Sequence, residues 1–459
     1  MREWFEAYGE VAVRSTARVP VACGVDIGST NSKVVALDAN GSVVSRSSRP
    51  TPRDAEDLSI DARRLFNAVE ELVLEVCGHR YIVHTISTAG VGEDGVLVDG
   101  NLQPLTKALA WFDPRRQGIF RALRPALQGD EMFDADTDSV RTIVGWKWSR
   151  DQAAAGSAHT WTALADLPGV LWSGRPYMSD TIASRTAAWR SSDRGWASPR
   201  VELTLGSSSL LPRVVRTGAV VGDFRSARLG AEGVVSSDAI TVAGGHDHPI
   251  GGWGVDQISP GAVLDSMGTA EVVVAQSPFP HVGRHDKVDI APGIQSDGTS
   301  VLRVEELARN VAWASQDPEV ASHVQALLEG RLEPEDVLDS KYFVPGQRGG
   351  GRPSYATDAP RDPAARASAV LGALAFAGRD AVDAVRRDLA DNAEVRLAGG
   401  WVRSPGWVRI KAIVNGYRTV PILEPEVTSV ATALLAARGR GWNPDPARAL
   451  SGAALVMSS

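Results

Sequence analysis

The stretch VPVACGVDIGSTNSKVVALDANGSVV (residues 19–44) decides the fold class. A first apolar run ends at the polar turn Gly28–Ser29–Thr30, a second ends near Asn40–Gly41, and a third begins directly afterwards. Apolar runs separated by such turn residues are typical of antiparallel strands. The sequence therefore predicts three strands, joined as two hairpins, at the start of the first domain.

The residues that follow complete an α/β unit. Apolar side chains recur at helical spacing over residues 61–77, with Leu65, Val69 and Val76 among them, and an apolar strand is expected over residues 81–87. The order hairpin, helix, strand predicts a mixed sheet covered by helices. Residues 113–240 are rich in Trp and irregular, and they predict no clear arrangement.

The same pattern starts again near residue 240. Residues 238–245 predict a strand, Pro249 suits the first turn of a helix, and residues 261–275 predict a second hairpin around Gly268. In both hairpins an Asp follows apolar residues, Asp26 in one and Asp265 in the other. A distant internal duplication explains this likeness better than coincidence. We expect an α/β fold of two domains with mixed sheets, residues 19–243 and 244–441, and a ligand cleft between them.

Composition excludes several classes of protein. The 459 residues carry a formal net charge of -7, so the chain lacks the basic field with which nucleic-acid-binding proteins neutralise phosphates. Apolar runs are far shorter than a membrane span, and the two cysteines, Cys23 and Cys77, suggest neither a disulfide framework nor a zinc cage. We expect a cytoplasmic protein with no nucleic-acid or membrane partner, and residues 1–18 as an extra arm.

The turn after the first strand is a candidate phosphate site. Gly28, Ser29 and Thr30 can direct backbone N–H groups and two hydroxyls at one anion, because glycine permits close approach. We expect the amide of Gly28 to be one of these donors, Lys33 to add a positive charge, and Asp26 to hold the Mg²⁺ that accompanies a nucleotide. The spacing excludes a Walker A loop, and an ordinary polar hairpin remains the alternative.

Two later stretches repeat or extend this device. The second hairpin places Ser266, Gly268 and Thr269 at its turn, and we expect its Gly268 amide to face the same phosphates. The paired glycines Gly399 and Gly400 follow a predicted strand and allow a flat ring or a phosphate to approach the backbone. Ser404 either binds a base edge or caps the next helix, as a plain Gly-Gly turn would also allow.

The stretch GGHDHP (residues 244–249) carries the candidate catalytic acid. Asp247 lies between a predicted strand and a predicted helix, where a carboxylate can accept a proton from a substrate hydroxyl. With an ordinary pKa of about 3.9 it would be ionised at neutral pH. His246 and His248 flank it, so a metal site or simple helix capping are the alternatives.

The stretch AWFDPRR (residues 110–116) suits a polyhydroxylated ligand. The ring of Trp111 can cover an apolar sugar face, while Asp113 and Arg115 bind hydroxyls. An exposed loop with an Asp-Arg pair of little energetic value is the alternative.

Taken in order, these stretches resemble the FGGY carbohydrate kinases, a branch of the actin/hexokinase/Hsp70-like ATPases, over residues 21–441. The resemblance implies two actin-like (ribonuclease H-like) domains, ATP and Mg²⁺ as cofactors, and Asp247 as the general base. It also implies substrate contacts at Glu93 and His248, and it covers the segment YMSDTIASRTAAWR with Asp180 and Arg185. The remaining implied residues are the phosphate and adenosine contacts Gly28, Ser29, Thr30, Lys33, Ser266, Gly268, Thr269, Gly399, Gly400 and Ser404.

The resemblance predicts an ATP-dependent kinase for a sugar or sugar alcohol, a ketopentose or a polyol, with a homodimer as a candidate assembly. The chain departs from the family pattern in its nucleotide half, for example at Ala398, Ile413 and Ala431. Two alternatives therefore stay open: a catalytically silent nucleotide- or sugar-binding relative, and an actin-like ATPase that needs no sugar.

Overall fold

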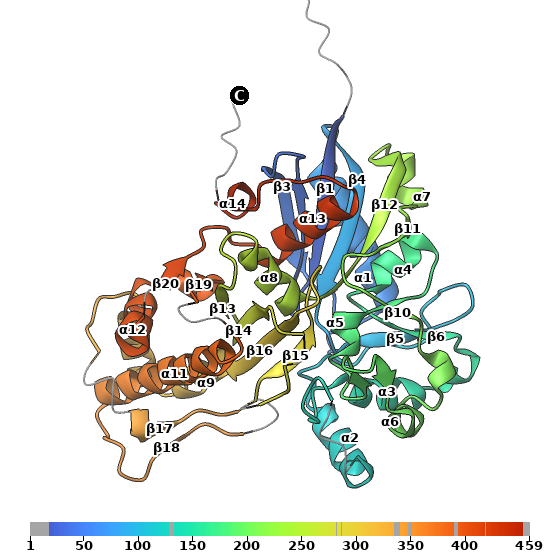
Figure 1. Cartoon of the computed structure of the whole chain (residues 1–459). Coiled ribbons are helices and arrows are strands. Elements are labelled where there is room, and N and C mark those ends of the chain that lie inside the picture. The colour runs from blue at the N-terminus through green and yellow to red at the C-terminus, as the bar shows by residue number, and fades with distance from the viewer. Residues whose placement is uncertain are drawn as a thin grey trace, which may run out of the picture.

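The structure is a computed structural model that describes residues 18–127, 133–280, 282–285, 287–334, 340–347, 351–389, 393–417 and 419–452. The predicted N-terminal arm lies, except for Arg18, outside the described residues. Two six-stranded sheets dominate the fold, one in each half of the molecule (Figure 1). The predicted α/β class with two mixed sheets flanked by helices is confirmed.

The first sheet has the strand order β11-β12-β4-β1-β2-β3. Strand β1 pairs antiparallel with β2 and parallel with β4. The predicted hairpins therefore lie beside the strand predicted over residues 81–87, which is β4. The strands are β1 (Val19–Ile27), β2 (Asn31–Leu37), β3 (Val43–Pro50), β4 (Tyr81–Gly90), β11 (Val220–Asp223) and β12 (Val235–His246). The predicted helix over residues 61–77 is confirmed as α1 (Ala62–Cys77), whose first turn is capped by the Asp61 carboxylate.

The second sheet has the order β15-β16-β14-β13-β19-β20. Strand β13 pairs antiparallel with β14 and parallel with β19. The strands are β13 (Val263–Met267), β14 (Ala270–Ser277), β15 (Asp289–Pro292), β16 (Thr299–Glu306), β19 (Val395–Ala398) and β20 (Thr419–Pro421). The second predicted hairpin is therefore confirmed.

The two sheets repeat one arrangement. Numbering the five strands shared by each sheet along the chain gives the order 3-2-1-4-5 in both, with the same parallel and antiparallel pairs. Strand β11 is an addition to the first sheet and β15 to the second. This repeated order supports the internal duplication that the two hairpins predict.

Helices separate and cover the sheets. Helices α8 (Asp247–Asp256) and α13 (Val427–Gly439) lie between the two sheets, α13 against the first and α8 against the second (Figure 1). The contact of α13 with β1 depends on Gly24, because a Cβ there would lie 2.1 Å from the Ser429 carbonyl oxygen. Helix α11 (Pro363–Arg386) covers the outer face of the second sheet, and α1 that of the first.

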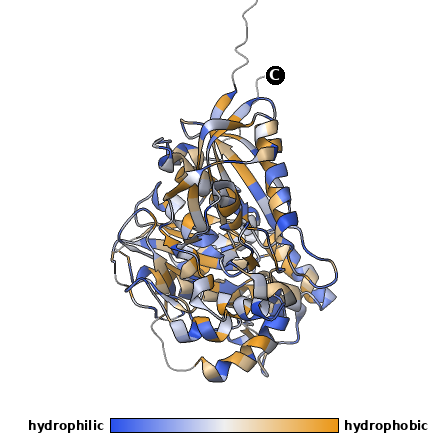
Figure 2. Cartoon of the chain, turned by 90° about the vertical axis from the view of Figure 1, so that its right-hand side faces the viewer, coloured by the Kyte–Doolittle hydropathy of each residue, from blue (hydrophilic) through white to orange (hydrophobic). Residues whose placement is uncertain are grey.

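The helices on the side seen in Figure 2 carry both hydrophobic and hydrophilic residues, as helices that cover a sheet do. Among the described residues, no helix combines the length and apolar content needed to cross a bilayer. The predicted border between residues 243 and 244 falls inside β12, which continues to His246 in the first sheet.

The Trp-rich stretch forms a separate layer below the first sheet (Figure 1). Its core includes Trp146, Trp161 and Trp189, all buried. The elements of this layer are α2 (Arg115–Leu123), α3 (Thr142–Arg150), β6 (Thr160–Ala163), β7 (Met178–Ser179), α5 (Asp180–Ala183), β8 (Trp189–Arg190), β9 (Gly195–Trp196), α6 (Ser198–Thr204) and β10 (Val214–Val215), together with β5 (Gly95–Val98), which pairs with β6. Helix α4 (Leu167–Ser173) lies instead against the first sheet. The smaller remaining elements are α7 (Ala227–Ala231), α9 (Ala308–Ala314), α10 (Pro318–Leu328), β17 (Phe343–Val344), β18 (Ser354–Tyr355), α12 (Pro405–Asn415) and α14 (Pro446–Ala449).

Candidate active site

A cavity of about 250 Å³ lies where the two halves meet. Both hairpin turns border it, and so do the start of α8 and the residues that follow β4. The predicted site residues that line it are Asp26, Gly28, Ser29, Thr30, Lys33, Glu93, Trp111, Asp247, His248, Ser266, Gly268 and Thr269. Residues from distant parts of the sequence thus converge on one cavity.

The first turn is held by its own hairpin and by neighbouring side chains. The amide of Gly28 donates to the carbonyl oxygen of Asn31 at 3.1 Å, so the expectation that this amide faces a phosphate is wrong. The indole N–H of Trp111 donates to Oγ of Ser29 at 2.7 Å. The guanidinium of Arg53, a residue that the motifs did not indicate, donates to the carbonyl oxygen of Ser29. Hydroxyls and the remaining amides of the turn are left as anion donors.

The second turn is built in a similar way. The amide of Gly268 donates to the carbonyl oxygen of Ala270 at 2.9 Å, so this amide too is used inside its hairpin and not for a phosphate. The indole N–H of Trp401 donates to the carbonyl oxygen of Gly268 at 2.9 Å. Gly399 has φ +90, and a Cβ there would lie 2.2 Å from the carbonyl oxygen of Met267. The Gly-Gly stretch therefore packs directly against the second turn, as only glycine permits.

Asp26 has the properties of a metal ligand. Its side chain is buried at the end of β1, opposite Lys33 in the hairpin, and its Oδ1 atom has no hydrogen-bond partner among the described residues. Burial raises the pKa of Asp26 to about 7; Lys33 opposes the rise, and Asp247 and Glu426 add to it. A bound cation would satisfy the orphan oxygen and favour the ionised carboxylate. The residue present thus fits a Mg²⁺ site.

Lys33 has a different environment from the one expected. Its ammonium group pairs with Glu426 at 2.5 Å, and both side chains are about one quarter exposed. Burial alone would lower the pKa of Lys33, but Asp26 and Glu426 outweigh it and raise the pKa. The charge therefore persists beside the cavity.

Asp247 is the first residue of α8, directly after β12 ends. The amide of His248 donates to its Oδ1 at 2.7 Å, while Nε2 of His246 lies 3.2 Å and Nδ1 of His248 lies 3.4 Å from the same oxygen. Burial raises the pKa of Asp247 to about 7, and the charge of Glu93 adds to the rise. The expectation of an ordinary pKa near 3.9 is therefore wrong, because the sequence does not reveal burial.

Glu93 and Arg185 form the buried wall of the cavity. The Nε and Nη2 atoms of Arg185 both donate to Oε1 of Glu93, at 2.9 and 2.7 Å. The sequence indicates Arg185 only as part of a family-like segment and not as a residue of the site. Its presence in the segment ASRT was the available signal.

Asp113 and Arg115 lie apart from this cavity. The guanidinium of Arg115 donates two hydrogen bonds to Asp113, at 2.9 and 2.6 Å, and lies 4.7 Å from the ring centre of Trp148. Asp113 lines a neighbouring cavity of about 550 Å³ that shares Trp111 with the first. Of the described residues that line these two cavities, none is Arg115.

Ser404 also lies outside the central cavity. It precedes α12 without capping it through its side chain, and it lines a separate hollow of about 420 Å³ beside α9 and α10. Gly399 and Gly400 lie between this hollow and the second turn, next to Trp401. The path from the second turn to Ser404 thus runs along one side of the second domain.

The cavity between the two repeated α/β sheets is lined by a turn from each sheet and by Asp247. Such an arrangement suits a kinase, because it can align a phosphoryl donor with an acceptor hydroxyl. The model of the N-terminal domain of the FGGY family of carbohydrate kinases matches residues 21–254, just over half of the chain. The chain belongs to the FGGY family of carbohydrate kinases.

Individual relatives differ in what they phosphorylate. The chain is 28% identical to a xylulose kinase of Streptomyces rubiginosus over 57% of this chain and 55% of that protein, so this match spans little more than half of the relative. It is 25% identical to a glycerol kinase of Agrobacterium fabrum over 92% of this chain and 90% of that protein.

Solved structures share the fold over nearly the whole chain. A gluconate kinase from Lactobacillus acidophilus superposes with a TM-score of 0.79, 17% identity, and coverage of 94% of this chain and 91% of that one. A Plasmodium falciparum glycerol kinase with ADP gives a TM-score of 0.77 and 14% identity, covering 95% and 92%. The two-domain actin-like fold is confirmed by these neighbours.

Proposed function

We propose that the protein is an ATP-dependent kinase that phosphorylates a hydroxyl of a neutral sugar or sugar alcohol, a ketopentose or a polyol. The observation that carries the proposal is the convergence of both hairpin turns and Asp247 on one cavity. Phosphoryl transfer requires mainly alignment of donor and acceptor and stabilisation of charge on the transferred group. Two turns and an acid around one cavity can supply both.

The nucleotide would lie along the second domain. We propose phosphate contacts at Ser29, Thr30 and Lys33 from one side and at Ser266 and Thr269 from the other, with Gly28 and Gly268 giving the phosphates room to approach the two turns. Gly399, Gly400 and Ser404 would continue the site towards adenosine, and the fold neighbour crystallised with ADP supports a nucleotide here. Asp26 would hold Mg²⁺, which neutralises charge on the phosphates, and its unpartnered Oδ1 supports this assignment.

The acceptor would lie beside Asp247. The carboxylate would orient the attacking hydroxyl and take its proton, while Glu93, Trp111 and His248 contact the remaining hydroxyls and the apolar face. The ion pair of Asp113 with Arg115 supports a role in holding the loop of Trp111.

The charges of the cavity support a neutral acceptor. Asp26, Glu93 and Asp247 line it, and the three donor atoms of Arg185 are engaged by Glu93 and Asp289. A sugar acid would bring a fourth carboxylate to this wall, and the other cation that lines the cavity, Lys33, is already paired with Glu426.

The experiment is a coupled assay of ADP release with pentitols, ketopentoses, glycerol and erythritol. Asp247→Asn is expected to lower the sugar-stimulated rate by about 10²- to 10⁴-fold, the usual contribution of a general base. A variant that keeps most of its sugar-stimulated ADP release would overturn the assignment of the base.

The other predictions stay proposals. A silent binding relative would bind ATP without turnover, and an actin-like ATPase would hydrolyse ATP without sugar. Asp247 at the cavity argues against the silent relative, and the cavity residues Glu93 and Trp111, which suit a sugar, argue against the ATPase. We propose two domains, residues 19–243 and 244–441, and a homodimer as the assembly, both of which can be tested with the purified protein. We also propose the cytoplasm as the location, which a localisation experiment can test.

A further inference from the structure

A buried cluster of four charged side chains joins the cavity wall to the second domain. Glu93, Arg185 and Arg141 come from the first half of the chain, and Asp289 is the first residue of β15 at the edge of the second sheet. The side chains of the four are at most 8% exposed. Two buried carboxylates face two buried guanidinium groups, and the partly exposed carboxylate of Asp138 lies 3.4 Å from Arg141.

Arg185 is the link in this cluster. Its Nε and Nη2 atoms bind Glu93, and its Nη1 donates to Oδ2 of Asp289 at 2.9 Å. Arg141 donates to the same Oδ2 at 2.8 Å. One planar guanidinium thus fixes the substrate-side carboxylate against a carboxylate of the other domain, and its fork geometry transmits orientation.

The contact between the start of β15 and residues 134–141, which we call the domain seam, is held by two further hydrogen bonds. The amide of Asp136 donates to Oδ1 of Asp289 at 3.0 Å, and the amide of Ile290 donates to the carbonyl oxygen of Asp134 at 2.8 Å. Asp289 therefore occupies its place only when β15 lies against the segment 134–141. Separation of the two halves would remove one of the two carboxylates that Arg185 binds.

We propose that Asp289 is a positioning residue that acts across the domain seam: through Arg185 it fixes Glu93 for the acceptor hydroxyls, so acceptor binding and closure of the halves strengthen each other. The inference rests on the proposed function, because it takes Glu93 as a substrate contact. Reciprocity follows from linkage, since a ligand that binds one arrangement better must favour that arrangement equally.

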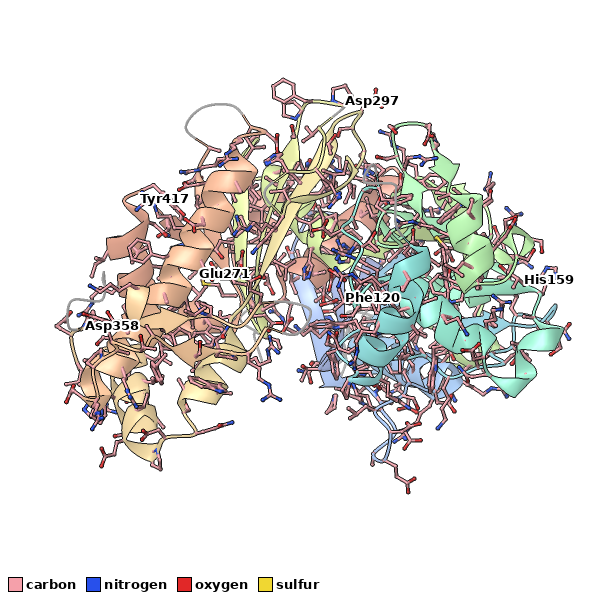
Figure 3. The ribbon with its side chains drawn as sticks, turned by 90° about the horizontal axis from the view of Figure 1, so that it is seen from below. Phe120, His159, Glu271, Asp297, Asp358 and Tyr417 are labelled. Atoms are coloured by element: carbon pink, nitrogen blue, oxygen red, sulfur yellow. The ribbon has the colours of Figure 1, made fainter. Side chains whose placement is uncertain are left out.

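Asp289→Asn is the test, with D-xylulose and glycerol as probes. Loss of the charge is expected to raise KM for the acceptor about tenfold or more, to change kcat less than about threefold, and to leave KM for ATP unchanged. Asp297→Asn is the matched control, because Asp297 pairs with Arg216 between the same two halves but is 98% exposed and has no link to Glu93. Asp297 lies at the outer edge of the molecule (Figure 3). The control should leave both KM values unchanged.

A double-mutant cycle separates positioning from simple loss of structure. In a Glu93→Gln background, Asp289→Asn should raise KM no further, because the group on which it acts is gone. Independent, additive effects, or an equal rise in the Asp297→Asn control, would overturn the proposal. If the Asn variant does not fold, Asp289→Glu keeps the buried charge but shifts the carboxylate, and should raise KM in the same selective way.

Hydrogen exchange distinguishes failure of this inference from failure of the proposed function. A wild type that phosphorylates no member of the acceptor panel contradicts the proposed function. The seam is then judged separately: D-xylulose should slow exchange of the Ile290 amide in the wild type and not in Asp289→Asn. Equal protection in both proteins, or in neither, would overturn the inference.

Discussion

The two hairpin turns have similar sequences but place their acids in opposite environments. Asp26 precedes Gly28 by two residues, faces the cavity and keeps an unpartnered oxygen. Asp265 precedes Gly268 by three residues, is fully buried and lies 2.9 Å from the ammonium group of Lys411. Side chains alternate between the faces of a strand, so this single residue of offset turns the second acid away from the cavity. Ser266 takes the cavity-facing position in its place.

The contrast between Asp26 and Asp265 shows that an Asp near a glycine turn is not enough to identify a metal ligand. Lys411 also contacts Glu271, so the three side chains form a buried cluster. Glu271 lies inside the second domain (Figure 3). Burial raises the pKa of Glu271 to about 8, and Asp265 adds to the rise. The rise favours a protonated Glu271 beside the ammonium group of Lys411. The acid of the first hairpin is therefore accessible from the cavity, while that of the second is held by an internal ion pair.

The largest expected effect separates these roles through Lys411. Lys411→Met leaves two acids buried without their cation, and should lower the free energy of unfolding by about 3–5 kcal/mol. The kcat of the folded fraction should change little, because Lys411 does not line the cavity. Urea unfolding and kinetics at low temperature provide the measurement. Glu271→Gln is the control and should cost much less, since its partner charge is retained; a large loss of kcat in Lys411→Met at full folding would contradict the comparison.

The second effect concerns Asp26, the acid on the ligand side. Asp26→Asn should lower kcat by about 10²-fold, the scale expected for removing a group that holds charge-neutralising Mg²⁺. Without Mg²⁺ or nucleotide, the same variant should unfold less readily at pH 8, because it removes a carboxylate whose ionisation burial opposes. Kinetics at varied Mg²⁺ and denaturant unfolding check both parts. A variant that is both less stable and fully active would show that Asp26 resembles Asp265 after all.

Local patterns predicted the parts of this comparison that lie within one hairpin. Alternating apolar runs and glycine turns predicted β1, β2, β13 and β14, and the motif around Asp247 predicted its position at the cavity, because strand ends and helix starts are set by nearby residues. The pairing of Arg185 with Asp289 was not predictable, since its members are 104 residues apart and belong to different halves. The raised pKa of Asp247 likewise depends on burial created by both domains.

The third effect is a pH profile. Asp247 must be ionised to take a proton, and its pKa is about 7, so kcat/KM should fall about tenfold per pH unit below that value. Stability should move in the opposite direction. The pKa of Asp247 is about 4 when unfolded and about 7 when folded, so the native state binds more protons between these values and the free energy of unfolding falls as pH rises.

Asp247→Asn is the control for both profiles. It should flatten the dependence of unfolding free energy on pH between about 4 and 7, leaving the part due to Asp26. A wild-type activity that stays constant from pH 8 down to pH 5 would exclude a base with a raised pKa.

The smallest expected effect compares two Trp side chains that hold the turns in the same manner. The indole of Trp111 donates to Oγ of Ser29, and that of Trp401 donates to the carbonyl oxygen of Gly268. Loss of one such hydrogen bond costs about 0.5–1.5 kcal/mol, so Trp401→Phe should raise KM for ATP about two- to tenfold and leave KM for the acceptor unchanged. Trp111→Phe should raise both, because Trp111 also lines the cavity beside Glu93. Identical changes in the two KM values of both variants would mean that the two turns do not differ in their effect on nucleotide and acceptor binding. The different placement of Asp26 and Asp265 would then have no effect on which ligand each turn binds.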